Sequence, residues 1–263
     1  MNVLLVITGD TGLQYHRQIS PHVVLDNATG NNLYNITATR NFDAYPDEKL
    51  KDQQIVYFLR TISMNGKTTD VVKRCHKNDT KVVLDIDDYW DIPHNHTNYL
   101  PAVKELVKYN TIEALQQSDL VVTTTDYFNN RIKDHTKKTA VQPNCIDLTQ
   151  PQWSSDSTTS PQVRFGWCGG LWHDADLELM ADSIQYTYQN SKTKNAQIVL
   201  GGYTENEYYQ NYQRILSANH KGGDSYARVM GTDVNNYGSI YNFFDVSLVP
   251  LVSNKFNSYK YWY

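Results

Sequence analysis

Three carboxylates stand close together at the end of a predicted buried strand. Asp85, Asp87 and Asp88 lie within four residues of one another. Like charges at this spacing repel unless they serve a cation, hydroxyl groups or helix N-termini. Tyr89 and Trp90 follow, and such rings can stack on the faces of sugars. Three interpretations are open: a metal-binding Asp-x-Asp pair, a cleft wall that hydrogen-bonds hydroxyl groups, or helix capping with solvated charge.

Two glycine turns follow predicted strands at the points where ligands bind in open α/β sheets. Gly169 and Gly170 stand between a strand and a helix, and His173 lies at the start of that helix. Backbone N–H groups in such a turn favour a diphosphate. The alternative is an ordinary turn in which Asp174 caps the helix. The earlier turn, which ends at Gly12, is equally compatible with ligand approach and with a tight connection.

Other chemistry-bearing residues give weaker signals. Lys255 and Lys260 follow the last predicted strand and could neutralise a diphosphate or simply be solvated. His94 and His96 form a His-x-His pair without a third ligand at a recognisable spacing, so no metal site is expected. Cys145 and Cys168 lack a convincing His partner for a nucleophilic thiol.

Short apolar runs and helical patterns must position these residues. The predicted strands are residues 3–7, 55–59, 82–86, 120–122 and 139–141, and then residues 163–167, 197–200, 227–230 and 245–251. Predicted helices separate them, and one of these begins with a capping box formed by Thr204 and Glu207. Strands that are apolar on both faces and separated by helices indicate parallel sheets. The stretch 148–162 is rich in Ser, Thr, Gln and Pro, which is typical of a linker. We therefore expect an α/β protein with two Rossmann-like domains, residues 1–147 and 163–263.

The composition excludes several classes of protein. The 263 residues include 24 Lys and Arg against 28 Asp and Glu, a net charge of −4 without a basic block. This balance gives no sign of non-specific binding to nucleic acid or to membrane surfaces. The N-terminal apolar run is too short for a signal peptide, and no stretch reaches membrane-span length. With three widely spaced cysteines, we expect a cytoplasmic protein without a disulfide framework.

Six segments, in order, resemble the motifs of GT-B fold glycosyltransferases, in particular the bacterial and phage group similar to family-1 and family-4 sugar transferases. Residues 12–21, GLQYHRQISP, resemble its Gly-x-x-x-Tyr-Arg-x-x-x-Pro opening, displaced by one residue. The other segments are residues 85–93 (DIDDYWDIP), 118–125 (SDLVVTTT), 143–147 (PNCID), 166–177 (GWCGGLWHDADL) and 244–260, which runs from FDVSLVPL to FN and Lys260. The resemblance runs through most of the chain.

This resemblance implies transfer of a sugar from a nucleotide-diphosphate sugar to an acceptor. The second domain would bind the donor diphosphate and the first would bind the acceptor, which could be a glycan, a protein or a modified nucleic acid. No cofactor is implied beyond the donor substrate. The implied residues are Gly169, Gly170, His173, Lys255 and Lys260 on the donor side, Gly12, Arg17, Arg60 and Trp90 on the acceptor side, and Asp87, Asp88 and His173 for catalysis.

One departure from the family pattern leaves alternatives open. The family continues past the position of Lys260 to a Glu motif that this sequence does not reach, so the second domain is expected to be incomplete. The first alternative is therefore an inactive or partial remnant that acts as a binding or scaffold protein. The second is a metal-dependent GT-A transferase that uses Asp85 and Asp87.

Overall fold

The computed structural model describes residues 1–9, 12–28, 30, 33–63, 66–154, 157–190, 195–218 and 225–260. The chain forms two compact units. Unit 1 comprises Met1–His94 and Tyr99–Asp147 together with the segment that begins at Lys255, and unit 2 comprises Asn95–Asn98 and Leu148–Asn254. The main division therefore falls between Asp147 and Leu148. The predicted second domain ran to residue 263, but residues 255–260 pack with unit 1.

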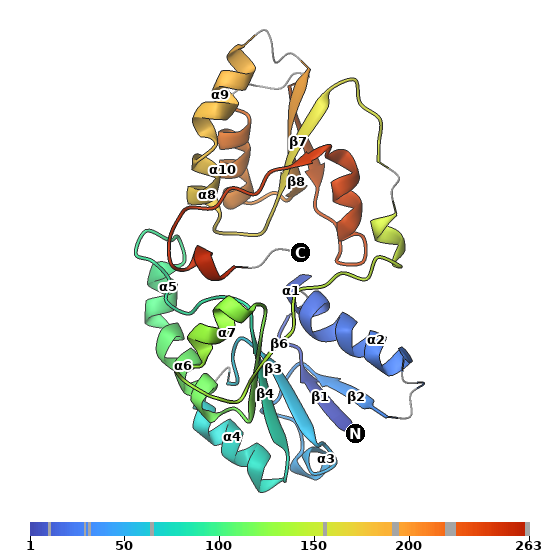
Figure 1. The fold of residues 1–263 in the computed structure, drawn as a ribbon, viewed down its shortest axis with the longest axis vertical. Helices are drawn as coiled ribbons and strands as arrows, with labels where there is room; N and C mark the ends of the chain where they lie inside the picture. Colours follow the sequence, from blue (N-terminus) through green and yellow to red (C-terminus); the bar gives the residue numbers. More distant parts are fainter. Residues whose placement is uncertain are drawn as a thin grey trace. The chain divides into compact units, whose positions relative to one another are not determined.

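Unit 1 is built on a six-stranded parallel sheet in the order β2-β1-β3-β4-β5-β6 (Figure 1). The strands are β1 (Asn2–Val6), β2 (Asn35–Thr39), β3 (Ile55–Leu59), β4 (Lys81–Ile86), β5 (Leu120–Thr123) and β6 (Thr139–Val141). Because all strands run in one direction, their carboxyl ends meet at one edge of the sheet. Of the predicted carboxylates, Asp85 lies near the carboxyl end of β4, and Asp87 and Asp88 follow the strand at that edge.

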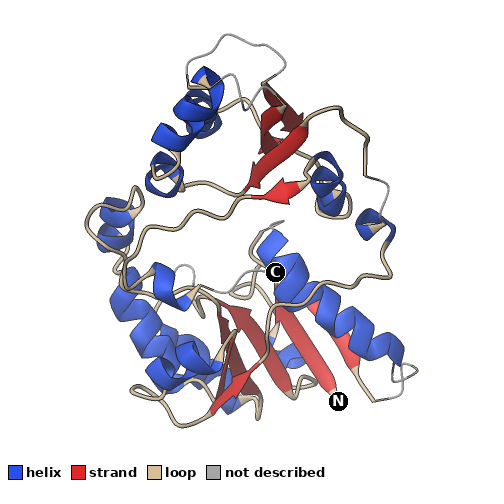
Figure 2. Cartoon of the chain, turned by 45° about the horizontal axis from the view of Figure 1, so that its top comes forward, coloured by secondary structure: helices blue, strands red, loops and turns tan. Residues whose placement is uncertain are grey.

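Helices connect the strands of unit 1 (Figure 2). They are α1 (Gly12–Gln14), the π-helix η1 (Tyr15–Ile19), α2 (Ser20–Ala28), α3 (Asp47–Leu50), α4 (Thr68–Lys77), α5 (Tyr99–Lys104), α6 (Val107–Gln117), α7 (Asp126–Ile132) and the 3-10 turn η5 (Asn257–Tyr259). Helix α4 packs beside α6. The Oγ of Thr125 accepts the N–H of Phe128 and caps α7.

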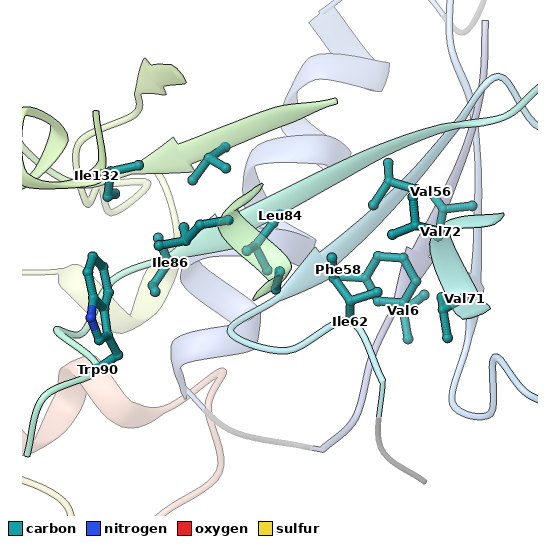
Figure 3. Packing of buried hydrophobic residues seen from close by; sticks show 14 of the residues in the cluster. Val6, Val56, Phe58, Ile62, Val71, Val72, Leu84, Ile86, Trp90 and Ile132 are labelled. Atoms are coloured by element: carbon teal, nitrogen blue, oxygen red, sulfur yellow. The ribbon is translucent and has the colours of Figure 1, made fainter. Parts of the chain in front are cut away.

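The main hydrophobic core of unit 1 lies between the sheet and its helices (Figure 3). Val56, Leu84 and Ile132 are fully buried in it. Phe256 and Tyr259 belong to the same core although they come from the far end of the sequence. Their burial explains why residues 255–260 join unit 1 rather than the second domain.

Unit 2 is built on a four-stranded parallel sheet in the order β10-β7-β8-β9. Its elements are η2 (Pro151–Trp153), β7 (Val163–Cys168), α8 (Asp174–Glu178), α9 (Ala181–Gln189), β8 (Ala196–Tyr203), α10 (Glu207–Leu216), β9 (Tyr226–Met230), η4 (Tyr237–Phe243) and β10 (Val246–Ser247). One core cluster includes Leu177, Leu200 and Tyr212, and a smaller one gathers around Ile240 and Phe244. A first strand flanked by the second and the fourth is the Rossmann-type order.

Several predicted elements differ in the structure. Asn206, rather than Thr204, caps α10 by accepting the N–H of Tyr209, so the predicted capping box is wrong. The last strand was expected over residues 245–251 but covers only Val246–Ser247, and Pro250 has no N–H with which to extend it. Within the predicted linker, η2 packs in unit 2, where the buried Gln152 accepts the N–H of Gly238.

Candidate functional site

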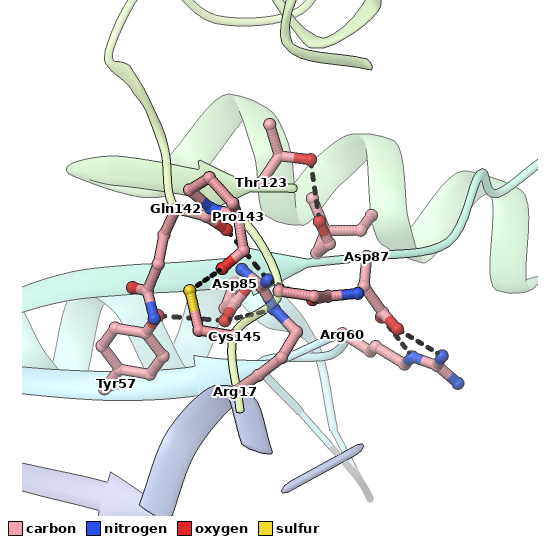
Figure 4. A network of polar contacts seen from close by, with 11 residues as sticks. Arg17, Tyr57, Arg60, Asp85, Asp87, Thr123, Gln142, Pro143 and Cys145 are labelled. Atoms are coloured by element: carbon pink, nitrogen blue, oxygen red, sulfur yellow. Dashed lines mark hydrogen bonds and ion pairs between the residues drawn. The ribbon is translucent and has the colours of Figure 1, made fainter. Parts of the chain in front are cut away.

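A buried ion pair lies at the carboxyl end of β4 (Figure 4). The side chains of Arg17 and Asp85 are both 0% exposed, and Arg17 Nη2 lies 2.7 Å from Asp85 Oδ1. Tyr57 donates its hydroxyl to Asp85 Oδ2 at 3.0 Å. Arg17 Nη1 donates to the Gln142 carbonyl and to Asn144 Oδ1. Arg17 therefore joins η1 to β4 and to the exit of β6.

This geometry corrects two interpretations of the sequence. Arg17 was expected to meet the acceptor, but its buried guanidinium holds protein groups together instead. Asp85 was an alternative metal ligand, but both its oxygens accept hydrogen bonds from Arg17. In the described ranges, no group of three or more His, Cys, Asp or Glu side chains is arranged to hold a metal ion.

Asp87 and Asp88 form a partly buried cluster with Arg60, which follows β3 and is the most exposed of the three. Arg60 donates to Asp87 Oδ1 at 2.7 Å, to Asp87 Oδ2 at 2.8 Å and to Asp88 Oδ2 at 2.6 Å. Burial alone would raise the pKa of Asp87, but the charge and hydrogen bonds of Arg60 outweigh it and lower that pKa. Arg60 has a φ of 64°, a left-handed conformation that is costly for a residue with a side chain. Such strain is often found at functional sites.

Trp90 was predicted to stack on an acceptor, and the structure contradicts this. Tyr89 and Trp90 are 2% and 4% exposed and belong to the core of unit 1. The Tyr89 ring lies 4.6 Å from that of Tyr259, and the Trp90 ring lies 6.0 Å from that of Phe128. The rings of Tyr89 and Trp90, which were expected to stack on a sugar, therefore pack inside unit 1 instead. Burial of large aromatic surfaces stabilises the fold strongly.

The turn after β1 is described only in part, since residues 10 and 11 lie outside the described ranges. Gly9 donates its N–H to Gln14 Oε1 at 2.6 Å. At Gly12, an added Cβ would meet nothing within 4 Å. The turn is therefore open at Gly12.

In unit 2, the turn after β7 carries the predicted glycine pair. A Cβ at Gly169 would come within 2.6 Å of the Trp167 ring, whereas one at Gly170 would meet nothing within 4 Å. Trp172 has a φ of 69° and is 40% exposed. The Gly169 carbonyl accepts the hydroxyl of Tyr209, and the Gly170 carbonyl accepts that of Tyr212.

His173 is tied into this turn. Its Nδ1 lies 2.9 Å from Asp176 Oδ2, and its backbone N–H donates to the Tyr212 hydroxyl. Asp176 also accepts the N–H of Val252 at 2.8 Å. The turn, the start of α8 and the chain after β10 are thus linked inside unit 2. Helix α8 has only five residues and carries Asp174 and Asp176 in its first turn, so its dipole contributes little to anion binding.

Lys255 and Lys260 were expected beside the donor diphosphate in the second domain. The structure places both in unit 1. Lys255 Nζ lies 5.4 Å from the centroid of the Tyr89 ring, and Lys260 Nζ lies 4.9 Å from that of Phe256. Phe256 and Tyr259 are buried in unit 1, and their burial places the neighbouring Lys255 and Lys260 in that unit as well.

The remaining candidates give no reactive centre. Burial raises the pKa of the Cys168 thiol to about 11, which disfavours its nucleophilic thiolate. Cys145 donates to the Pro143 carbonyl. The His94 ring packs 4.5 Å from that of Tyr99, and His96 accepts the N–H of Asn98.

Wherever the chain is described, no helix has the length and apolarity needed to cross a membrane.

Tyr209 and Tyr212 were not foreseen as parts of the site. In the sequence, the pattern around Tyr212 indicates only an apolar helix face. The sequence does carry one signal, which is that these positions hold tyrosine although phenylalanine would fill the same space. Because a buried tyrosine hydroxyl needs a hydrogen-bond partner, tyrosines on a buried helix face indicate a polar contact there. Their i, i+3 spacing places both hydroxyls on one face of α10.

The fold is that of the GT-B glycosyltransferases. A trehalose-6-phosphate synthase, OtsA, matches with a TM-score of 0.52 and 11% identity over 88% of this chain and 56% of its own. A trehalose-6-phosphate structure from E. coli with UDP-2-fluoro glucose bound matches with a TM-score of 0.57 and 10% identity over 95% and 78%. The MnaA–UDP structure from S. aureus matches with a TM-score of 0.50 and 10% identity over 90% and 70%.

These likenesses lie in the fold rather than in the sequence. No family model matches the chain, and neither does any curated protein. The chain spans a little over half the length of both OtsA structures that it matches, 55% and 56%. The GT-B fold also rules out the GT-A alternative, because the chain has two Rossmann-like sheets.

Proposed function

We propose that this chain transfers a glycosyl group from a nucleoside-diphosphate sugar to an acceptor hydroxyl. The observation that carries the proposal is the turn at Gly169 and Gly170. It follows a parallel strand of a GT-B fold, and its exposed side is open at Gly170. Matched structures hold UDP or UDP-2-fluoro glucose, so UDP-sugars are the first donors to test.

In the proposed reaction, the acceptor oxygen attacks the anomeric carbon while the bond from that carbon to the diphosphate oxygen breaks. The departing diphosphate gains negative charge. Backbone N–H groups of the glycine turn, together with His173, would stabilise that charge. One well-placed donor of this kind is worth roughly 10²–10³ in rate.

Unit 1 supplies the proposed acceptor groups. Asp88 is 31% exposed and gives one carboxylate oxygen, Oδ2, to Arg60. We assign Asp88 to accept a hydrogen bond from the acceptor hydroxyl and to take its proton. Asp87, held by Arg60 through both oxygens, would fix the position of that cluster. The open turn at Gly12 would lie on the same acceptor side. The acceptor would be a glycan, a protein or a modified nucleic acid.

The test is a panel of UDP-, GDP-, ADP- and TDP-sugars with the full chain, measured by calorimetry and by release of the nucleoside diphosphate. Sugar transferred to an acceptor, or donor turned over with release of the diphosphate, supports the proposal. Asp88→Asn should lower turnover without weakening donor binding, and Asp134→Asn, an exposed site elsewhere in unit 1, is the matched control.

Other results would contradict the transferase. An isomerised donor sugar would indicate an epimerase, and one matched structure, from Listeria monocytogenes, is described as a putative UDP-N-acetylglucosamine 2-epimerase, with a TM-score of 0.50 and 9% identity. Donor binding without turnover would indicate a binding or scaffold protein. Failure to bind any donor would end the proposal.

A further inference from the structure

Two tyrosines of α10 hold the peptide planes of the glycine turn. Tyr209 donates its hydroxyl to the Gly169 carbonyl at 2.7 Å. Three residues later, Tyr212 donates to the Gly170 carbonyl at 3.3 Å and accepts the N–H of His173 at 3.0 Å. Both side chains are buried, with Tyr209 8% and Tyr212 0% exposed.

The direction of these carbonyls fixes the direction of two N–H groups. In a planar trans peptide, the C=O and the N–H point in opposite directions. With the Gly169 and Gly170 carbonyls turned toward α10, the N–H groups of Gly170 and Leu171 point away from it. Within the described parts of the chain, neither of these N–H groups has a hydrogen-bond acceptor. Gly170 and Leu171 are both exposed.

Packing alone does not explain the two hydroxyls. The Tyr212 ring lies 5.2 Å from that of Trp167 and 5.4 Å from that of Tyr209, and phenylalanine would make the same ring contacts. A buried hydroxyl destabilises the fold unless it is hydrogen-bonded. Both hydroxyls find their partners in the carbonyls of the turn. Burial raises the pKa of Tyr209 to about 12, so its hydroxyl stays a proton donor at neutral pH.

We propose that Tyr209 and Tyr212 are positioning residues that aim the N–H groups of Gly170 and Leu171 at the diphosphate of the donor. This inference rests on the proposed donor site. The tyrosines do not touch the ligand. They keep two carbonyl oxygens, which would repel an anion, on the inner side of the turn.

The test compares Tyr209→Phe and Tyr212→Phe with Tyr188→Phe. Tyr188 makes the same kind of bond in the same unit, from its hydroxyl to the Leu216 carbonyl at 2.7 Å, away from the turn. Dissociation constants for UDP and for inorganic pyrophosphate are measured beside thermal unfolding. We expect binding to weaken roughly tenfold in Tyr209→Phe and in Tyr212→Phe, as for one lost hydrogen bond to a charged group, and to stay unchanged in Tyr188→Phe. Equal affinities in all three variants would overturn the inference.

A second measurement separates this inference from the proposed function. Backbone NMR order parameters of Gly170 and Leu171 need no ligand. We expect order parameters of about 0.85 in the parent chain and of about 0.6 in Tyr209→Phe. If the parent chain binds neither UDP nor pyrophosphate, the proposed donor site is wrong, and the N–H groups of Gly170 and Leu171 are not directed at a diphosphate. An unchanged order parameter would refute the positioning role itself.

Discussion

The stability of unit 1 depends clearly on two single side chains, those of the ion pair between Arg17 and Asp85. Both are fully buried, so removal of one leaves the other charge without a partner in a medium that solvates it poorly. Arg17→Met should lower the free energy of unfolding by about 3–5 kcal/mol. Urea unfolding followed by circular dichroism measures this loss.

The control for this prediction is the double variant Arg17→Met, Asp85→Asn. It removes both charges, and the amide oxygen that replaces the carboxylate can still accept the hydroxyl of Tyr57. We expect it to recover part of the stability lost by Arg17→Met. If the double variant is no more stable than the single one, the unpartnered charge is not the cause of the loss.

The glycine pair offers a matched comparison at adjacent positions. A methyl group at Gly169 would meet the Trp167 ring at 2.6 Å, and one at Gly170 would meet nothing within 4 Å. Gly169→Ala should therefore destabilise unit 2 by about 1–3 kcal/mol through overpacking. Gly170→Ala should change stability by less than about 0.5 kcal/mol. Thermal unfolding decides this, and equal effects would show that Trp167 moves aside easily.

Single residues were the hardest feature to predict. Asp87 and Asp88 could be placed at a strand end because strands and their exits are visible in the apolar pattern. Trp90 could not be assigned, since its ring packs against those of Phe128 and His135, which are distant in the sequence. The same holds for Arg17, whose partner Asp85 lies 68 residues away.

At the scale of elements, Asp119 joins the starts of β4 and β5. It accepts the N–H of Val82 at 2.9 Å and faces His76 at 2.8 Å and Lys81 at 3.4 Å. Burial opposes ionisation, but these partners together lower the pKa of Asp119 below its ordinary 3.8. A lowered pKa adds stability above the unfolded pKa, and that stability is lost as the pH falls through the folded value.

We therefore expect Asp119→Asn to lower the free energy of unfolding at pH 7 by about 1 kcal/mol, because a charge-assisted hydrogen bond is lost. The difference from the parent chain should shrink below roughly pH 4. Urea unfolding between pH 2.5 and 7 tests this. Asp134→Asn, on an exposed pair with Arg131, is the control and should change stability little. A difference that persists at the lowest pH would contradict the assignment.

The central strands were predictable, while the edges were not. The predicted ranges 55–59 and 139–141 coincide with β3 and β6, since their apolar residues are continuous and their ends are marked. Strand β2 (NITAT) was missed because it is partly exposed and polar and pairs with β1 through its backbone. Strand β10 was predicted too long, because the predicted range 245–251 is mostly apolar although it contains Pro250, which cannot extend the strand.

At the scale of the whole chain, the alternation of strands and helices was enough to predict two parallel sheets. The boundary after Asp147 also lies where the polar stretch begins. The return of the chain to unit 1 after Asn254 could not be predicted, because no local pattern marks it. It depends on two aromatic side chains, and this dependence can be tested directly.

Phe256 anchors the returning segment. Its side chain is 6% exposed within the core of unit 1. Phe256→Ala should lower the free energy of unfolding of unit 1 by about 3–5 kcal/mol, since it removes buried surface and leaves a cavity. Hydrogen exchange measures where protection is lost, and we expect faster exchange in β3, β4 and β5 but not in β7 and β8. Lys255→Ala, on the exposed side of the same segment, should cost less than about 1 kcal/mol. Loss of protection confined to unit 2 would place the segment with the second domain after all, as the sequence pattern had indicated.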